Sequence, residues 1–240
     1  MSYRSLLLLA FAVVSATGKL DFRPCEKDDT DCLRRISQAF LLSTYSGDSD
    51  LGVPPLDPLI IPSLTGPVDD ELGFGLNFKN LNITGLKDLK LKDFILITDD
   101  KSVLVAHAGD FQVTGDVEVK LTKSNKSFKG LYTALASVVQ TARYKYSLET
   151  VEGNEYFTIG PETNSCEITN EPTVTIGTEL QNSLDKDNDA NSLKQQYLSK
   201  QSEIRKKTLC LISNAASVTV INNIRIFANH FPKTAFFTDL

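Results

Sequence analysis

The sequence predicts an α+β fold, an elongated roll in which a strongly curved antiparallel sheet wraps a long C-terminal α-helix. Apolar and polar residues alternate with period two in several stretches between residues 75 and 176, as in a sheet with one wet face. Beyond them, apolar residues recur every seven positions from Tyr197 to Val218, inside a helical segment of residues 191–230. At 1.5 Å per residue, a helix of about 38 residues spans about 57 Å. Such a length suits a sheet that wraps around the helix better than a compact sandwich.

The chain begins with a predicted secretory leader. Arg4 precedes an apolar run and small residues follow at Ser15 and Ala16. This pattern predicts a signal peptide over residues 1–16, with cleavage as late as residue 18, and one domain over residues 17–240. The run of roughly eleven apolar residues is too short to cross a bilayer. We expect no later segment to be long enough either, and so no membrane span. The sequence therefore predicts a secreted, extracellular protein.

Four cysteines in an exported chain predict two disulfide bonds. Of the three possible pairings, the local bond between Cys25 and Cys32 is the most economical, which leaves Cys166 with Cys210. A zinc site is the alternative, but the spacings are unlike those of zinc ligands and both histidines are distant in sequence.

Two glycosylation sequons fit the same secretory route. They begin at Asn82 and Asn125. If they carry sugar, both asparagines are expected on exposed edges of the fold.

The charge pattern argues against a nucleic-acid partner. The formal net charge is -5 at pH 7. The densest basic cluster is Arg205-Lys206-Lys207, which falls in the C-terminal helical stretch, where we expect a solvated face and not an anion site. The sequence contains no phosphate-binding glycine loop, so we expect no cofactor, and we expect a monomer.

A short amphipathic helix is predicted over residues 31–45, with Thr30 or Asp31 as its N-cap. Its apolar residues recur at helical spacing and are Leu33, Ile36, Phe40 and Leu41. Several prolines then hold the chain extended as far as a predicted turn at Gly66-Pro67.

Strands are predicted over most of the middle of the chain. The first set comprises residues 76–81, 89–98, 102–107 and 111–121, and the second comprises 128–148, 156 to about 166, and 173–176. Period two places Tyr144 and Tyr146 on the apolar face of their strand, and Tyr132 is a further inward candidate. These tyrosines either pack in the sheet or point their hydroxyls into a ligand cavity.

Candidates for catalysis are few. Ser49 in Gly47-Asp-Ser-Asp50 resembles the serine motif of lipolytic hydrolases, but a helix precedes it and no acid stands at the required step before His230. His107 is the other histidine, so the sequence offers few candidates for a histidine general acid or base. We therefore expect no catalytic centre.

Asp185, Asp187 and Asp189 have the spacing that opens a calcium-binding loop. The sixth position of the pattern is Ala190 instead of glycine and the twelfth is Gln196 instead of glutamate. A solvated loop that caps the following helix is the better interpretation, and we predict no metal site.

The inward faces combine many aliphatic and aromatic side chains with isolated hydroxyls. This composition is typical of a cavity for an oily ligand with one or two polar atoms. The sequence therefore favours a carrier over an enzyme.

The chain resembles the lepidopteran haemolymph juvenile hormone binding proteins, within the wider takeout-like family. The resemblance covers nearly the whole mature chain and is carried by Pro24-Cys25 with Cys32-Leu33, Leu56–Leu59, Phe78–Gly85, Ser127–Thr133, Arg143-Tyr144, Pro161–Thr163 with Cys166, and His230–Pro232 leading to Phe236-Phe237.

The resemblance implies a helix wrapped by a curved sheet with two end cavities, one of which takes juvenile hormone. It implies that the N-terminal helix is a gate, braced by the Cys25–Cys32 bond, with Leu33, Ile36 and Phe40 on its inner face. It places the tyrosine that bonds the hormone's epoxide at Tyr144. The implied function is to carry the hormone in haemolymph and protect it from hydrolysis. The alternatives are a takeout-like carrier of another terpenoid or a fatty acid, a secreted esterase acting through Ser49, and a protein-binding role.

Overall fold

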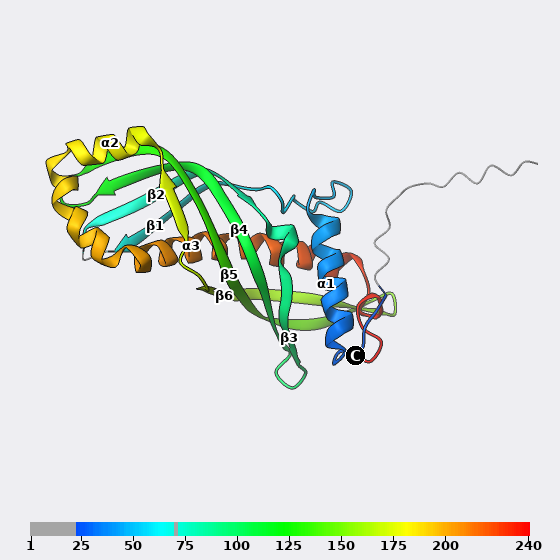
Figure 1. The fold of residues 1–240 in the computed structure, drawn as a ribbon. Coiled ribbons are helices and arrows are strands. Elements are labelled where there is room, and N and C mark those ends of the chain that lie inside the picture. Colours follow the sequence, from blue (N-terminus) through cyan, green and yellow to red (C-terminus); the bar gives the residue numbers. More distant parts are fainter. Residues whose placement is uncertain (1–22, 70–71) are drawn as a thin grey trace, which may run out of the picture.

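The computed structural model describes residues 23–69 and 72–240, so the predicted signal peptide lies outside the described residues. Seven antiparallel strands form one sheet that curls, without closing, around the long helix α3, Asn188–His230 (Figure 1). Helix α1, Thr30–Thr44, lies across one end of the roll, and α2, Thr178–Lys186, lies at the other. The predicted α+β roll is confirmed.

Two long strands run along the roll and carry different neighbours at its two ends. They are β4, Ser102–Leu121, and β5, Lys126–Val151, which pair along the whole of β4. The other strands are β1, Leu59–Asp69; β2, Phe74–Thr84; β3, Lys90–Ile97; β6, Asn154–Ile168; and β7, Thr173–Ile176. The sheet order is β1-β2-β4-β5-β6, with β3 on the first half of β4 and β7 on the first half of β5. The wall near α1 is therefore built with β3 and β6, and the wall near α2 with β2 and β7.

Two predicted breaks in the sheet are wrong. The segments 102–107 and 111–121 form one strand, because the ladder to β5 continues through the pairs Gly109 with Val138 and Asp110 with Ser137. Gly66 lies within β1 and is not a turn. A Cβ atom at Gly66 would lie 2.7 Å from Cδ2 of Leu211 on α3, so the glycine permits close approach of the helix.

Helices α1 and α3 begin at side-chain caps. The carboxylate of Asp29 accepts a hydrogen bond from the Cys32 amide at 2.9 Å, so α1 is capped by Asp29 and not by Thr30 or Asp31. The Asp187 carboxylate accepts from the amides of Asp189 and Ala190 and caps α3. With 43 residues, α3 is slightly longer than predicted. Helix α2 was not predicted.

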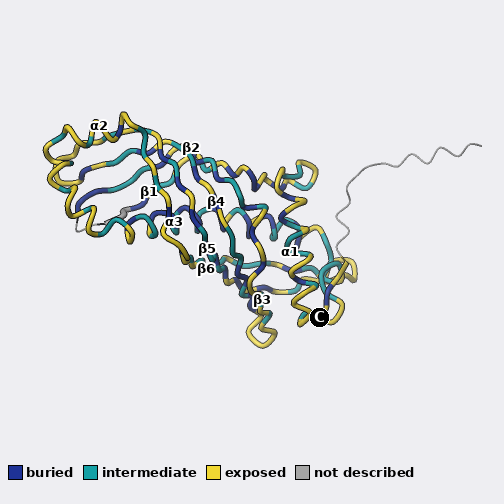
Figure 2. Tube along the Cα trace, viewed as in Figure 1, coloured by how far each residue is buried: buried dark blue, intermediate teal, exposed yellow. Residues whose placement is uncertain are grey.

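Among the described residues, α3 is the single helix long and apolar enough to cross a membrane by length and composition. The expectation that no later segment reaches that length is therefore wrong. The buried residues of α3 include Ile204, Leu209 and Ile212. Figure 2 shows α3 inside the curled sheet, with buried stretches along its length. Part of the apolar length of this helix is therefore buried inside the roll.

Both disulfides join the pairs that the sequence favours. Cys25–Cys32 links the segment before α1 to its first turn, and Cys166–Cys210 ties β6 to α3. Disulfides of this kind suit an oxidising compartment.

The two sequons lie in different surroundings. Asn125 is exposed in the turn between β4 and β5. Asn82 lies within β2, between Ile60 of β1 and Thr114 of β4, and its Oδ1 atom is buried without a hydrogen-bond partner. The expectation of an exposed edge is wrong for Asn82 because β1 covers that side of β2.

Candidate functional site

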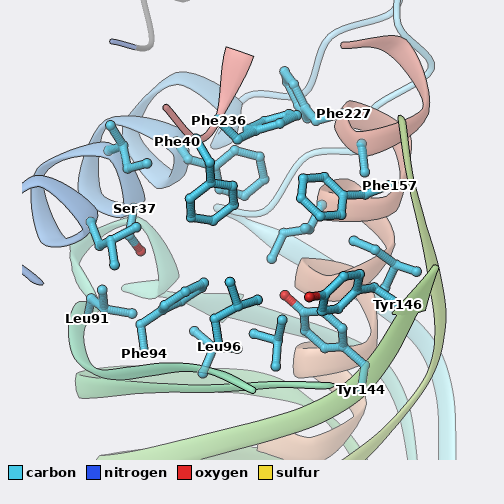
Figure 3. A pocket seen from close by; sticks show the side chains of 18 of the residues that line it. Ser37, Phe40, Leu91, Phe94, Leu96, Tyr144, Tyr146, Phe157, Phe227 and Phe236 are labelled. Carbon is cyan, nitrogen blue, oxygen red and sulfur yellow. The ribbon is translucent and has the colours of Figure 1, made fainter. Parts of the chain in front are cut away.

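A cavity of about 170 Å³, here called the proximal cavity, lies beneath α1 (Figure 3). Its walls come from α1, β3–β6, the last turns of α3 and the C-terminal tail. Among the described residues, no Asp, Glu, Lys or Arg side chain lines it. The lining residues are Leu33, Ile36, Ser37, Phe40, Leu91, Phe94, Leu96, Val103, Val105, His107, Tyr144, Tyr146, Phe157, Ile159, Ile224, Phe227, Ala228, Phe236 and Phe237.

The proximal cavity brings together five of the six residues proposed from the sequence. Leu33, Ile36 and Phe40 share one face of α1 and cover the cavity. Tyr144 and Tyr146 are two residues apart on β5 and so share the face of the sheet that lines the cavity. Figure 3 shows both phenol oxygens inside the cavity.

Tyr144 offers a hydroxyl to the cavity. It pairs across the sheet with Val103 of β4 and Glu162 of β6 and is 6% exposed. Within the described chain its hydroxyl has no hydrogen-bond partner. Burial raises the pKa of this phenol, with Arg225 acting weakly in the opposite direction. The group is therefore a neutral donor at physiological pH.

Tyr146 is the second hydroxyl of the cavity. Burial raises the pKa of Tyr146, and the nearby Asp100 carboxylate adds to the shift. Its ring packs edge-on against Phe157, with centroids 5.4 Å apart. The two phenols therefore present neutral polar atoms on a wall whose other polar side chains are Ser37 and His107.

Arg225 of α3 fixes β6 behind Tyr144. The pairing of β5 with β6 shifts register between Tyr144 and Tyr146, which frees backbone carbonyls opposite the bulge. The Arg225 guanidinium donates to the Gly160 carbonyl at 2.7 Å and to the carboxylate of Glu162. The Glu162 side chain is 8% exposed, so this is a largely buried ion pair.

Contacts from the middle of α1 close the cavity on one side. Oγ of Ser37 lies 3.0 Å from Nε2 of His107 on β4, and Nε2 of Gln38 donates to the Lys87 carbonyl at 2.9 Å. Burial lowers the pKa of His107 to about 4, so the imidazole is neutral at physiological pH.

The C-terminal tail closes the other side. The Cys25 amide donates to the Phe236 carbonyl and the Thr238 amide donates to the Cys25 carbonyl, both at 3.0 Å. Phe236 and Phe237 line the cavity from this tail. The segment before α1 and the end of the chain therefore form one unit.

Sequence reasoning missed several lining residues. His107 shares its face of β4 with Val103 and Val105, a period-two signal that could have found it. Phe236 and Phe237 were noted only as part of a resemblance, and no local pattern links them to Cys25. Their place depends on a contact between the two ends of the chain.

Tyr132 does not belong to this site. It lines a second, distal cavity of about 400 Å³ at the α2 end and packs edge-on against Phe78, with ring centroids 5.1 Å apart. Tyr132 and Tyr144 share a face of β5, but twelve residues of strand separate them by about 40 Å. The period-two pattern correctly predicted that Tyr132 lies on the inward face of β5. It could not predict at which end of the roll Tyr132 lies.

The residues considered above for catalysis and for calcium binding lie in a surface turn and in ion pairs. Ser49 lies in a turn, where its carbonyl accepts from the Gly52 amide, and it lines neither cavity. Asp185 pairs with Lys194 at 2.8 Å, and Lys126 pairs with both Asp187 and Asp189. Over residues 23–69 and 72–240, no group of three or more His, Cys, Asp or Glu side chains is placed to hold a metal ion.

Comparisons with known proteins agree with this architecture. Residues 6–161 match the family model for haemolymph juvenile hormone binding protein. The chain is 42% identical over 229 residues to the juvenile hormone-binding protein of Manduca sexta, which covers 95% of this chain and 100% of that protein. Its fold is similar to the crystal structure of Epiphyas postvittana Takeout 1, with a TM-score of 0.74, 15% identity, and coverage of 90% of this chain and 99% of that one. The chain therefore belongs to the haemolymph juvenile hormone binding protein family.

Proposed function

We propose that this protein is a secreted carrier that holds juvenile hormone in the proximal cavity and transports it in haemolymph. One observation carries the proposal: an uncharged apolar cavity receives two phenol hydroxyls from its wall and is covered by a helix. A relative 42% identical to this chain is named a juvenile hormone-binding protein, which supports the choice of ligand.

The binding energy would come from the apolar wall. Burial of roughly 400 Å² of ligand surface at about 25 cal/mol/Å² supplies about 10 kcal/mol before ordering costs. Sub-micromolar affinity is therefore within reach of the apolar contacts and one or two hydrogen bonds.

Tyr144 would select the ligand by donating to an ether-type oxygen such as the epoxide of the hormone. Its hydroxyl is buried, so a ligand without an acceptor leaves it unpaired at a cost of about 1 to 3 kcal/mol. Tyr146 would offer a second donor nearby. Ligands of the same shape without oxygens would thus bind more weakly.

Helix α1 would act as the gate. The cavity of about 170 Å³ is below the range of about 300 to 1,000 Å³ typical of small-ligand sites, so ligand entry requires an outward movement of a wall. Beside the apolar contacts of Leu33, Ile36 and Phe40, side chains of α1 hold it to the body through the Ser37–His107 and Gln38–Lys87 contacts. Its first turn stays tethered through Cys25–Cys32, which would make that end the hinge.

The carrier would protect the hormone without reacting with it. The pair that most resembles a nucleophile and its base is Ser37 with His107, because both line the cavity. In hydrolases of the Ser-His-Asp type a carboxylate orients the imidazole, and no Asp or Glu of the described chain lines this cavity. A closed α1 would instead keep the ester of the hormone away from water and esterases.

Secretion and glycosylation belong to the same proposal. The two disulfides suit an oxidising route. Asn125 is the sequon that an oligosaccharide could occupy without disturbing the sheet, because its turn is exposed.

Equilibrium binding of labelled juvenile hormone to the disulfide-intact protein tests the function. Unlabelled hormone and palmitate are added as separate competitors. Displacement by hormone alone, with sub-micromolar affinity, supports the hormone carrier. Equal displacement by palmitate would favour a general carrier of other hydrophobic ligands, and no saturable binding would favour a protein-binding role.

A further inference from the structure

The distal cavity is the larger of the two cavities described above, and the hormone proposal does not use it. It measures about 400 Å³ and lies between α2, the first half of α3 and the strands of the far wall. Its apolar lining includes Phe74, Leu76, Val117 and Val119. The volume falls within the range of small-ligand sites.

Two residues of its lining each carry a buried polar atom that has no hydrogen-bond partner among the described residues. The atoms are Oη of Tyr132 on β5 and Nε of Arg205 on α3. Native interiors leave few polar atoms unpaired, because each one loses its bonds to water on burial. Two such donors in neighbouring lining residues of one cavity favour a ligand that accepts hydrogen bonds.

The charge of Arg205 narrows the class of ligand. A guanidinium is always protonated, and within the described chain Arg205 forms no ion pair. The other charged groups on the lining, Asp185 and Lys194, pair with each other at 2.8 Å. The cavity wall therefore carries one unbalanced positive charge.

This placement corrects the prediction that the whole basic triplet is a solvated face. Lys206 and Lys207 do face outward, with 42% and 59% of their side chains exposed and with Glu171 and Glu203 as partners. Arg205 instead turns toward the distal cavity. The Arg205 charge acts to lower the pKa of Tyr132, against the larger effect of burial, so the two groups lie within electrostatic reach of each other.

We propose that the distal cavity is a second ligand site that binds a long-chain fatty acid, with its carboxylate between Arg205 and Tyr132 and its chain against the apolar wall. A carboxylate satisfies both donors and balances the guanidinium charge, and such charge-assisted bonds are the stronger kind. A neutral ester or alcohol would leave the charge unbalanced. The site is independent of the proximal cavity, which lies at the other end of the roll.

The test is calorimetric titration of the delipidated, full-length mature protein with palmitate and with methyl palmitate. Palmitate should bind one site and methyl palmitate should bind at least about tenfold more weakly. Arg205→Met should weaken palmitate binding about tenfold, and Tyr132→Phe should weaken it by a smaller factor. Lys206→Met is the matched control, since it removes the neighbouring charge from the outer face, and it should leave the affinity unchanged.

The unaltered protein supplies a second readout if a variant folds poorly. In ¹⁵N-labelled protein, the Arg205 Nε–H resonance should shift on addition of palmitate and not on addition of methyl palmitate. Saturating juvenile hormone should leave palmitate binding intact. The proposal is overturned if palmitate does not bind, or if methyl palmitate binds with equal affinity. It is also overturned if Arg205→Met leaves the palmitate affinity unchanged, or if Tyr144→Phe or hormone abolishes palmitate binding. Hormone affinity is measured separately, in the wild-type protein and in Tyr144→Phe, so the failure of this proposal is distinguishable from the failure of the proposed function.

Discussion

Nε2 of His107 on β4 lies 3.0 Å from Oγ of Ser37 on α1, which makes a partly buried imidazole part of the contact between the gate and the sheet. The pKa of His107 is about 4 in the folded protein and about 6.5 in an unfolded chain. The unfolded state therefore binds more protons between these values. Stability from this group is fully present above pH 6.5 and is lost as the pH falls toward 4.

Acidification should consequently destabilise the fold through His107. At pH 5 the loss is about 2 kcal/mol in the free energy of unfolding relative to pH 7.5. Urea unfolding at both pH values, compared with His107→Gln, isolates the effect because glutamine does not titrate. His230→Gln, at the exposed end of α3, is the matched control and should keep the wild-type dependence. An identical pH dependence in His107→Gln would contradict the assignment.

Tyr144→Phe should weaken juvenile hormone binding about tenfold, or about 1.4 kcal/mol, because it removes a buried donor and leaves the packing intact. Tyr132→Phe makes the same chemical change on the same strand face at the other end of the roll and should not alter hormone affinity. Equilibrium binding to both variants gives the comparison. Equal losses in the two variants would remove Tyr144 from the site.

The two disulfides should differ in their effects on stability and on hormone release. Replacing Cys25 and Cys32 by serine opens a link of sequence separation 7, and replacing Cys166 and Cys210 opens one of separation 44. Chain entropy gives losses of about 2 and about 4 kcal/mol in the free energy of unfolding.

Hormone release should show the reverse order. It should be faster in the Cys25→Ser/Cys32→Ser protein, because α1 loses its tether, and close to wild type in the Cys166→Ser/Cys210→Ser protein. Stopped-flow release rates and urea unfolding measure the two quantities. Unchanged release without the N-terminal bond would argue against a tethered gate.

Arg225→Met should destabilise the protein by about 3 kcal/mol or more, since the Glu162 carboxylate remains buried without its partner. Glu162→Gln removes the charge and keeps the shape, so Arg225→Met combined with Glu162→Gln should lose less than the two single losses added together. Urea unfolding of the singles and the double variant completes the cycle. Simple additivity would mean that the pair contributes little coupling.

Much of the fold was predictable from local patterns. Period two identified the face of β5 that carries Tyr144, and helical spacing identified the inner face of α1. The errors have a common cause in partners distant along the chain. Gly66 was predicted to be a turn because the helix that packs against it, α3, lies far away in sequence. The strand β4 was predicted as two strands because Gly109 and Asp110 look like a turn, and only their pairing with β5 keeps them in the strand.

The sequence by itself determined the class of each main element, the economical disulfide pairing and the apolar character of the sheet face, because these depend on residues close together in the chain or on composition. Only the tertiary structure decided which residues share a cavity. In the folded chain Tyr132 and Tyr144 lie at opposite ends of β5, and Ser37 meets His107. Arg205 lines the distal cavity, and the Cys25 backbone bonds to that of Phe236. These relations depend on where long strands and a long helix meet in space, which no local pattern encodes.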